Sequence, residues 1–315
     1  MQRRTVLTSG LAFPLVASTG LAIPRSLLAQ DLSYEDQPVT RWRIGLVLTT
    51  PVTCTNVMAT FPVPTEWPEQ TVTIRSQNIP ANVRIDTRDL SGAKQVIVQI
   101  PRVAAGSRTE VNFEFDIQRS RVLPPETTDT LVKPQRIARE LRRYMGNSPF
   151  IDASHRKIRN ACREIETQTF SNHWEQVEAI YDYVREKVQY VEGDLKNASK
   201  ALEEGKGDCE EMTSLFVAMC RNLDIPARVV WIPDHCYPEF YLEDANGDGH
   251  WYPCQAAGTR QFGRMDETRP VLQKGDRFKV PEKKGAVRYV SEFFRCDRRG
   301  KGNPKPIFIR ERIDV

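Results

Sequence analysis

The chain has 315 residues, of which 40% are apolar and 27% are charged. This balance is typical of a globular protein and excludes a largely disordered one, and the length allows two ordinary domains. The formal net charge of +4 includes three arginines in the first thirty residues, and the remainder has 42 basic and 41 acidic residues. A chain so close to neutral gives no electrostatic reason to expect nucleic acid as a partner.

Residues 1–30 have the pattern of a targeting segment. Arg3 and Arg4 precede a short apolar run, and residues of small or modest size lead to Ala29. This arrangement predicts a secretory signal peptide, and the paired arginines resemble the twin-arginine type. We therefore expect an exported protein, periplasmic or extracellular, whose seven cysteines meet an oxidising compartment. An uncleaved signal anchor is the alternative, and no later apolar stretch is long enough for a stable membrane span.

Residues 31–125 are predicted to form a β-sandwich-like domain. Apolar and polar residues alternate over 42–48 and again over 111–117, which is the period of half-buried strands. Turns that contain proline or glycine separate the apolar runs at short intervals, as in small sandwiches. A pair of prolines then begins a polar stretch, so residues 126–150 are predicted to be a linker that leads into helical sequence.

Residues 151–315 are predicted to form a second domain in which helices precede strands. Apolar residues recur at i, i+3, i+4 and i+7 within 158–165 and 177–188, the period of amphipathic helices. A third helix is expected from Cys209 to about Leu223, because a proline closely follows it. Helices followed by strands indicate an α+β fold. The expected strands are 227–232, a hairpin of 236–242 with 250–255, and two C-terminal strands at 286–294 and 306–309.

Cys209 stands at the predicted start of the third helix, in the sequence Gly205-Lys206-Gly207-Asp208-Cys209-Glu210-Glu211. Asp208 is a favourable N-cap, and acidic residues suit the first turn. The unpaired amides and the positive end of the helix dipole favour a thiolate there, and the same amides can stabilise an oxyanion. Cys209 is therefore a candidate nucleophile, and a chance position at a helix start is the alternative.

The candidate base is one of four histidines, because a thiol nucleophile needs a base within hydrogen-bonding reach. His155 and His173 lie at predicted helix starts, where capping or surface roles are expected. His235 lies between two predicted strands, 26 positions after Cys209. A side chain at that place can face the start of a helix that packs on the sheet, so His235 is the candidate base.

The predicted hairpin offers a residue to orient His235. If Gln255 lies directly opposite His235, the alternation of faces places Cys236 opposite Cys254 on the other side of the sheet. The two thiols then form a cross-strand disulfide or stay free and buried. A zinc site of these thiols with His250 would need a distorted hairpin, because His250 lies about 13 Å along the strand from Cys254.

The hairpin turn resembles a calcium loop only in part. Asp244, Asn246 and Asp248 match the start of such a loop, but its twelfth position is Gln255 and not the bidentate glutamate. The flanking segments are also predicted to be strands and not helices. A polar hairpin turn is the better interpretation, and we expect neither a metal nor a cofactor.

Several segments around Cys209 and His235 form an ordered set that is hard to obtain by chance. They are Ile180-Tyr181-Asp182-Tyr183-Val184-Arg185, Ala201-Leu202, Gly207-Asp208-Cys209, Leu215-Phe216, Cys220-Arg221-Asn222-Leu223-Asp224-Ile225-Pro226-Ala227-Arg228-Val229-Val230, His235, Glu239-Phe240-Tyr241-Leu242 and Trp251-Tyr252-Pro253. This set resembles the transglutaminase-like superfamily. The similarity covers about residues 150–257, and the segment around Cys209 is its most specific part.

The resemblance implies a papain-like core, with helices packed on an antiparallel sheet, and a thiol site of Cys, His and Asp in that order. It implies that Cys209 is the nucleophile and His235 the general base and later acid. The sequence departs from the family at Gln255, which stands where the family usually has Asp. A carboxamide can still accept a hydrogen bond from the imidazole and orient it, but it supplies no negative charge.

Two functions from different classes follow. The first is thiol-dependent acyl transfer or hydrolysis at amide bonds of a protein or peptide substrate through a Cys209 thioester, as in a cysteine peptidase, an amidase or a protein-glutamine transferase. The second is a catalytically inactive domain that binds peptide or cell-envelope material, which Gln255 favours. An open cleft at Cys209 favours the first, and an aromatic such as Trp251 or Tyr190 that fills this space favours the second. Disulfide exchange is disfavoured because the chain lacks a Cys-x-x-Cys motif.

Overall fold

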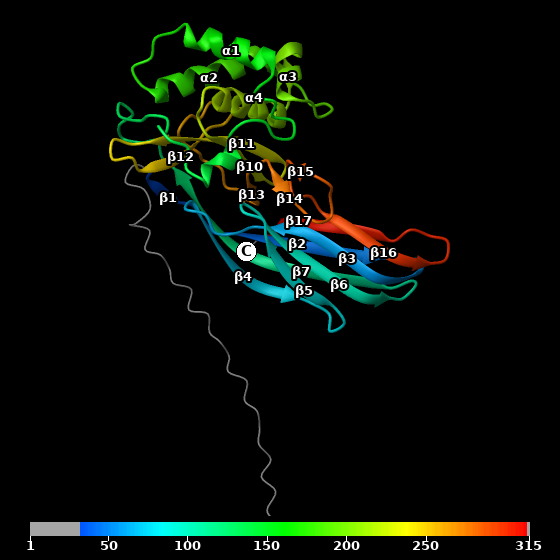
Figure 1. Ribbon diagram of the computed structural model, residues 1–315. Coiled ribbons are helices and arrows are strands. Elements are labelled where there is room, and N and C mark those ends of the chain that lie inside the picture. The colour runs from blue at the N-terminus through cyan, green and yellow to red at the C-terminus, as the bar shows by residue number, and fades with distance from the viewer. Residues whose placement is uncertain (1–31, 314–315) are drawn as a thin grey trace, which may run out of the picture.

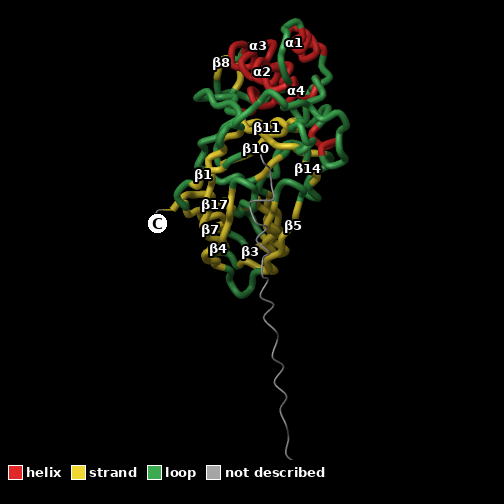
Figure 2. The backbone as a smooth tube through the Cα atoms, turned by 90° about the vertical axis from the view of Figure 1, so that its left-hand side faces the viewer, coloured by secondary structure: helices red, strands yellow, loops and turns green. Residues whose placement is uncertain are grey.

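The computed structural model describes residues 32–313, so the predicted signal segment, residues 1–30, lies outside the described residues. Figure 1 shows a helical layer at one end, a small sheet beneath it and a β-sandwich at the other end. Figure 2 shows the same division from the side, with the long helices gathered beyond the strands. The α+β fold class is confirmed.

The sandwich consists of two antiparallel sheets. One has the order β1-β7-β2-β17, and β4 also pairs with β7; the other has the order β16-β3-β6-β5. Apolar residues that alternate along these strands are buried between the sheets, among them Ile44, Val98 and Phe113. The bounds are β1 Tyr34–Asp36, β2 Thr40–Thr49, β3 Thr53–Val63, β4 Gln70–Asn78, β5 Arg84–Asp89, β6 Lys94–Val103, β7 Arg108–Val122, β16 Phe293–Arg299 and β17 Lys305–Ile313.

The C-terminal strands belong to the sandwich and not to the second domain. β16 pairs with β3, and β17 pairs with β2 over its whole length. Each adds an edge strand to a sheet by pairing with residues more than two hundred positions earlier. The prediction that residues 151–315 form one domain is wrong for these strands, because a strand's own alternation does not say which sheet it completes. The sandwich therefore contains both ends of the described chain.

The core sheet has four antiparallel strands in the order β12-β11-β10-β13. One face carries the helices, which bury a large apolar cluster with residues such as Trp231 and Phe240. The other face carries Val230 and Tyr237, which pack toward the sandwich with Val122. The bounds are α1 Arg156–Glu166, α2 His173–Lys187, α3 Ala198–Glu204, α4 Cys209–Asn222, β10 Ala227–Ile232, β11 His235–Glu243, β12 Gly249–Pro253 and β13 Gln273–Lys274.

The remaining elements are short. A 3₁₀ turn, Leu141–Tyr144, lies in the segment predicted as a linker, and β8 (Gln189–Tyr190) pairs in parallel with β9 (Lys206–Gly207). β14 (Phe278–Lys279) pairs with β15 (Ala286–Val287). The strand expected over 286–294 is thus only β15 and the first residues of β16. The chain here leaves the core sheet and crosses to the sandwich.

Buried polar groups join the sandwich to the core sheet. Glu69, which precedes β4, lies 2.7 Å from Lys274 of β13, and Lys274 lies 2.6 Å from Glu239 of β11. All three side chains are buried. The Gln70 side chain also donates to the backbone oxygen of Val271 and accepts from its amide, at 3.0 and 2.7 Å. This interface holds the two parts of the chain in one arrangement.

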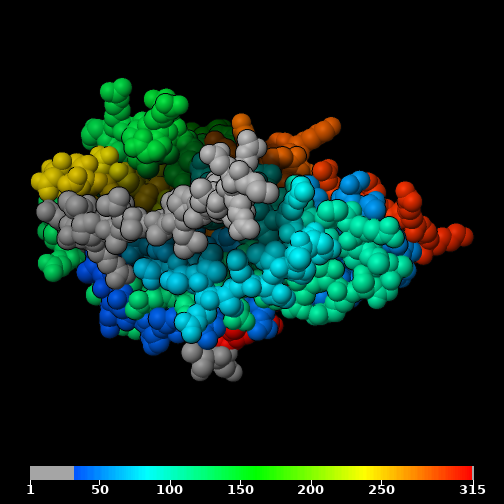
Figure 3. All heavy atoms as spheres, turned by 90° about the horizontal axis from the view of Figure 1, so that it is seen from below, coloured from blue at the N-terminus to red at the C-terminus, as the bar shows by residue number. Residues whose placement is uncertain are grey.

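The molecule is elongated along the sandwich. Figure 3 shows the face opposite the helices, where the blue to teal N-terminal strands form much of the surface and the orange-red connection between β16 and β17 projects at one end. In residues 32–313 we find no helix with the length and apolar character that crossing a membrane requires.

Candidate active site

Cys209 is the first residue of α4 and is held there by a capping box. The Asp208 carboxylate accepts from the amide of Glu210 at 2.7 Å, and the Glu211 carboxylate accepts from the amide of Asp208 at 2.9 Å. A side chain at Gly207 would place its Cβ 2.6 Å from the Cβ of Glu211, which explains the glycine before the cap. The cap does not use the Cys209 amide, so this N–H remains a donor at the helix start.

His235 begins β11 after a two-residue turn. Ile232 of β10 pairs with His235, and Pro233-Asp234 makes the connection. Asp234 has φ +57°, a left-handed conformation that Asp tolerates better than most residues. Because this turn is so short, the imidazole is fixed at the end of the core sheet, beside the start of α4.

Gln255 lies behind His235. Its Oε1 is 2.9 Å from His235 Nε2, which leaves Nδ1 of the ring for the Cys209 side. The backbone oxygen of Gln255 accepts from Tyr181 Oη at 2.9 Å and from Arg185 Nη1 at 3.1 Å. Its amide donates to Gln261 at 2.8 Å. The α2 helix and the 255–261 turn therefore fix the residue that orients the imidazole.

The predicted hairpin register is wrong by two residues. Glu239 pairs with Pro253 and Leu242 with His250, so Gln255 is not directly opposite His235. The chain leaves the hairpin after Cys254, whose amide donates to Pro238, and the Gln255 side chain reaches His235 from beyond the strand end. His235 and Gln255 therefore form the expected hydrogen bond, although they are not paired across the hairpin.

The cysteines expected to face each other across the hairpin are both free. The thiol of Cys236 instead donates a hydrogen bond to the sulfur of Cys209, and the backbone amide of Cys236 donates to the same sulfur. Cys236 is only 1% exposed. Cys236, the residue that follows His235, therefore contacts the sulfur of Cys209.

The thiol of Cys209 is acidic in this setting. The hydrogen bond from Cys236 and the contact with His235 outweigh burial and lower the pKa of Cys209 to about 5. Burial alone would lower the pKa of His235, but its hydrogen bonds to Cys209 and Gln255 raise that pKa above its ordinary value. At neutral pH this arrangement favours a thiolate beside an imidazolium, the ion pair of a thiol nucleophile.

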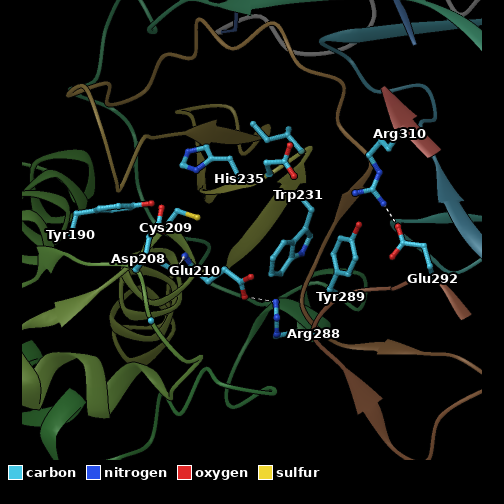
Figure 4. A pocket seen from close by; sticks show the side chains of 14 residues that line it. Tyr190, Asp208, Cys209, Glu210, Trp231, His235, Arg288, Tyr289, Glu292 and Arg310 are labelled. Atoms are coloured by element: carbon cyan, nitrogen blue, oxygen red, sulfur yellow. Dashed lines mark hydrogen bonds and ion pairs between the residues drawn. The ribbon is translucent and has the colours of Figure 1, made fainter. Parts of the chain in front are cut away.

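Cys209 and His235 open on a cleft of about 580 Å³. Figure 4 shows them at one side, with Tyr190 beside Cys209. Arg288 and Tyr289 form the far wall, and Arg310 of β17 contributes from the sandwich. The cleft therefore lies where the core and the sandwich meet. It is lined by Tyr190, Glu192, Gly193, Asp208, Cys209, Glu210, Trp231, Ile232, Asp234, His235, Arg288, Tyr289, Glu292 and Arg310.

Neither candidate aromatic fills this space. Tyr190 lines the cleft but is 52% exposed. Trp251 lies on the outer hairpin strand, where the Arg228 guanidinium stands 3.9 Å from its ring centroid. Within the cleft, Glu210 forms an ion pair with Arg288, and burial raises the pKa of Glu210 to about 7. The cleft is open, which is the arrangement expected of a reactive site.

The other candidate residues have structural surroundings. His155 caps α1 through Nδ1, which accepts from the Lys157 amide, and His173 begins α2. His250 packs against Tyr252. Asp244 accepts from the amides of Asn246 and Asp248, as in a polar hairpin turn. Among residues 32–313 no group of three potential ligands could hold a metal ion.

Sequence reasoning missed four residues that shape this site. Tyr181 entered the prediction only within an apolar helix that resembles the family, and Cys236 only as a hairpin thiol, yet the first supports Gln255 and the second contacts Cys209. Arg185 entered the prediction only within the helical segment that resembles the family and Arg288 not at all, because their partners are distant in sequence. Only its hydroxyl, a polar group on an otherwise apolar and buried stripe, could have marked Tyr181 as a hydrogen-bonding residue.

Comparisons with known proteins bear on the family and the fold. Residues 156–256 match the transglutaminase-like superfamily, so the resemblance found in the sequence is confirmed. A Cytophaga hutchinsonii protein, provisionally named a cysteine protease, has a similar fold, with a TM-score of 0.57 at 15% identity over 90% of this chain and 94% of its own. A Parabacteroides distasonis protein, provisionally named a protease, aligns with a TM-score of 0.28 at 11% identity over 73% of this chain and 48% of its own. No curated protein matches the chain.

Proposed function

Residues 156–256 of this chain form a transglutaminase-like core, and from that premise we propose that the protein catalyses acyl transfer or hydrolysis at amide bonds of proteins or peptides. The family supports a general cysteine-protease-like function. In the proposal Cys209 is the nucleophile, His235 the general base and later acid, and Gln255 the group that orients the imidazole. The acceptor of the acyl group is water or an amine.

The reaction follows from the positions of these groups. The Cys209 thiolate attacks the amide carbonyl, and the negative charge that develops on oxygen meets the unused Cys209 amide at the start of α4. His235, protonated by the ion pair, gives its proton to the leaving amine. The resulting thioester is attacked by water or by a primary amine, from which His235 removes a proton. Each cycle returns the thiolate and the imidazolium.

One observation carries the proposal. His235 Nε2 is hydrogen-bonded to Gln255 Oε1 at 2.9 Å. The imidazole ring also contacts Cys209, in a cleft that a substrate can enter. A domain that only bound peptide would not need an acidic thiol, an oriented imidazole and access to both. The carboxamide leaves the orientation intact, and His235 draws its proton affinity from Cys209 as well as from Gln255.

The experiment incubates the purified protein with denatured protein substrates, with and without a fluorescent primary amine. We expect new peptide termini if water is the acceptor, or incorporation of the amine if it is a transferase, and loss of either in Cys209→Ala. Cys254→Ala is the matched control, because that thiol is buried and does not contact the cleft. If the wild type and Cys209→Ala both lack turnover but bind peptide equally, the inactive-domain alternative holds.

Export is part of the proposal. The segment 1–30 supports it through its paired arginines and apolar run. Expression of the full chain in bacterial cells, followed by N-terminal sequencing of the periplasmic fraction, tests it. A mature protein that begins near residue 31 is expected, and replacement of Arg3 and Arg4 by lysine should retain the precursor in the cytoplasm. An uncleaved chain in the membrane fraction would instead indicate a signal anchor.

A further inference from the structure

Two thiols of unequal access meet at the nucleophile. Cys209 lines the cleft, whereas Cys236 is 1% exposed and lies among the apolar residues between α4 and the core sheet. Their sulfurs are in hydrogen-bonding contact. A reagent that enters the cleft therefore reaches Cys209 first, and Cys236 is accessible mainly to the sulfur of Cys209.

The backbone holds this contact from two rigid elements. Cys209 begins α4, and Cys236 is the second residue of β11, paired with Trp231 of β10. The backbone amide of Cys236 also donates a hydrogen bond to the Cys209 sulfur, and the Thr213 hydroxyl contacts the Cys236 thiol. A bond between the two sulfurs would thus join neighbouring ends of a helix and a strand that already pack together.

We propose that Cys209 is a site of reversible oxidation by hydroperoxides, and that Cys236 is the resolving thiol that closes a Cys209–Cys236 disulfide. The inference goes beyond the proposed amide chemistry and needs only a reactive Cys209. The disulfide occupies the nucleophile and so closes the site. It also protects Cys209, because sulfinic and sulfonic acids are not reduced by thiols.

The steps balance. The Cys209 thiolate attacks the terminal oxygen of a hydroperoxide, the O–O bond breaks, and the released alkoxide takes a proton to become an alcohol, or water from hydrogen peroxide. Cys209 is then a sulfenic acid. The Cys236 sulfur attacks the sulfenic sulfur, the S–O bond breaks, and hydroxide leaves with the Cys236 proton as water. The two thiols have lost two electrons to the peroxide, and a small dithiol returns them by exchange.

A second thiol pair provides an internal comparison. In the sandwich, Cys296 of β16 contacts Cys54 of β3. Cys54 is fully buried, and Cys296 is half-buried with a pKa raised to about 11. A thiol that stays protonated reacts poorly with peroxide, because the thiolate is the nucleophile. Cys296, with its raised pKa, and Cys54, which peroxide cannot reach because it is fully buried, should therefore remain reduced at peroxide levels that oxidise Cys209.

The test treats the purified protein with hydrogen peroxide, alkylates the remaining thiols and digests with trypsin and a Glu-specific protease. This digestion isolates Cys209 in 207–210 and Cys236 in 229–239, apart from Cys220 and Cys254. The linked pair of these peptides, lighter by two hydrogen atoms than the separate thiols, is expected. Dithiothreitol should then restore iodoacetamide labelling of Cys209.

Variants make the result decisive. In Cys236→Ala and Cys236→Ser, Cys209 should pass to sulfinic acid at peroxide doses at which the wild type is recoverable, and recovery by dithiothreitol should fall by roughly tenfold. Cys254→Ala should behave as the wild type. Circular dichroism shows whether each variant is folded. Equal sulfinic acid in wild type and Cys236 variants, or a disulfide at other cysteines only, overturns the proposal. None of these readouts depends on amide turnover, so the proposed function can fail separately.

Discussion

At position 255 a carboxamide stands where the transglutaminase-like superfamily usually has a carboxylate. Its oxygen still bonds to His235 Nε2 at 2.9 Å, so the ring orientation that a carboxylate would fix is kept. What is missing is the negative charge that stabilises an imidazolium. Here the contact between Cys209 and His235 contributes to that stabilisation, since it raises the pKa of His235 against the effect of burial.

Replacement of Gln255 by alanine should therefore lower the reactivity of the Cys209 thiol. Without the orienting oxygen the imidazole turns away from the sulfur, and the rate of iodoacetamide labelling at pH 6 should fall by about tenfold. Gln255→Asp should keep or raise that rate, because a carboxylate favours imidazolium. Gln168→Ala, at an exposed position, is the control. An unchanged rate in Gln255→Ala would show that Gln255 does not orient the ring.

The residues of this site were predictable to different degrees. Asp208 and Cys209 are adjacent in sequence, so their cap and helix start could be read directly. The pair of His235 and Gln255 was expected from a hairpin register that the structure does not have, and the two meet only because the chain turns after Cys254. The contact of Cys236 with Cys209 depends on how α4 packs on β11, which no local pattern specifies.

At the scale of elements, α2 supports the site without touching the substrate cleft. Its residues Tyr181 and Arg185 both donate to the backbone oxygen of Gln255, and Tyr181 Oη also accepts from the amide of Gln261 at 3.1 Å. The apolar stripe that identifies α2 as a core helix therefore includes a polar atom that determines where the 255–261 turn lies.

Tyr181→Phe should loosen this turn. The substitution keeps the ring but leaves the Gln261 amide without its acceptor, so we expect a loss of about 1 kcal/mol in the free energy of unfolding. Cys209 labelling should also slow several-fold, because Gln255 is less well held. Tyr183→Phe is a matched control on the same helix, since its hydroxyl bonds to Glu164 at the surface. Equal labelling in both variants would exclude a positioning role for Tyr181.

Helices and strands of the core were largely predictable because their periodicity is local. The helices α1, α2 and α4 and the strand β10 lie where the sequence places them. The short α3 was missed, since seven residues give too few turns for a periodic signal. The C-terminal strands were predicted to belong to the second domain and not to the sandwich, because strand pairing over such sequence distances is determined by tertiary packing.

At the scale of the whole molecule, the cleft depends on both parts of the chain. Cys209 and His235 come from the core, whereas Arg310 belongs to β17 of the sandwich. The buried carboxylates and cation between the two parts, Glu69, Lys274 and Glu239, have little access to solvent. Removal of one of these three charges leaves an unpaired buried charge, which strongly lowers the free energy of unfolding.

Lys274→Met should therefore destabilise the whole molecule. The substitution leaves Glu69 and Glu239 without the cation between them, so the free energy of unfolding should fall by about 3–5 kcal/mol. Urea unfolding, followed by tryptophan fluorescence, measures the change. Lys301→Met, at an exposed position, should alter it little. A Lys274→Met protein as stable as the wild type would mean that this ion pair network does not support the interface.

Acid should act on the same interface. Burial raises the pKa of Glu69, but Lys274 and Arg119 outweigh it and lower that pKa to about 2. A carboxyl whose pKa is lower in the folded state stabilises the fold above its unfolded value, near 4.3, and loses this contribution as the pH falls toward 2. Stability measured between about pH 5 and pH 2 should thus fall less steeply in Glu69→Gln than in the wild type.

The most direct test of the central claim is the pH dependence of Cys209 alkylation by iodoacetamide. With the pKa of Cys209 lowered to about 5, the rate should rise through that pH and be level at neutrality. In His235→Ala the midpoint should move upward toward the ordinary thiol value of about 8.5, and Cys209→Ala identifies the labelled residue. A Cys209 that does not react, or that titrates near 8.5 whether or not His235 is present, would contradict the catalytic account.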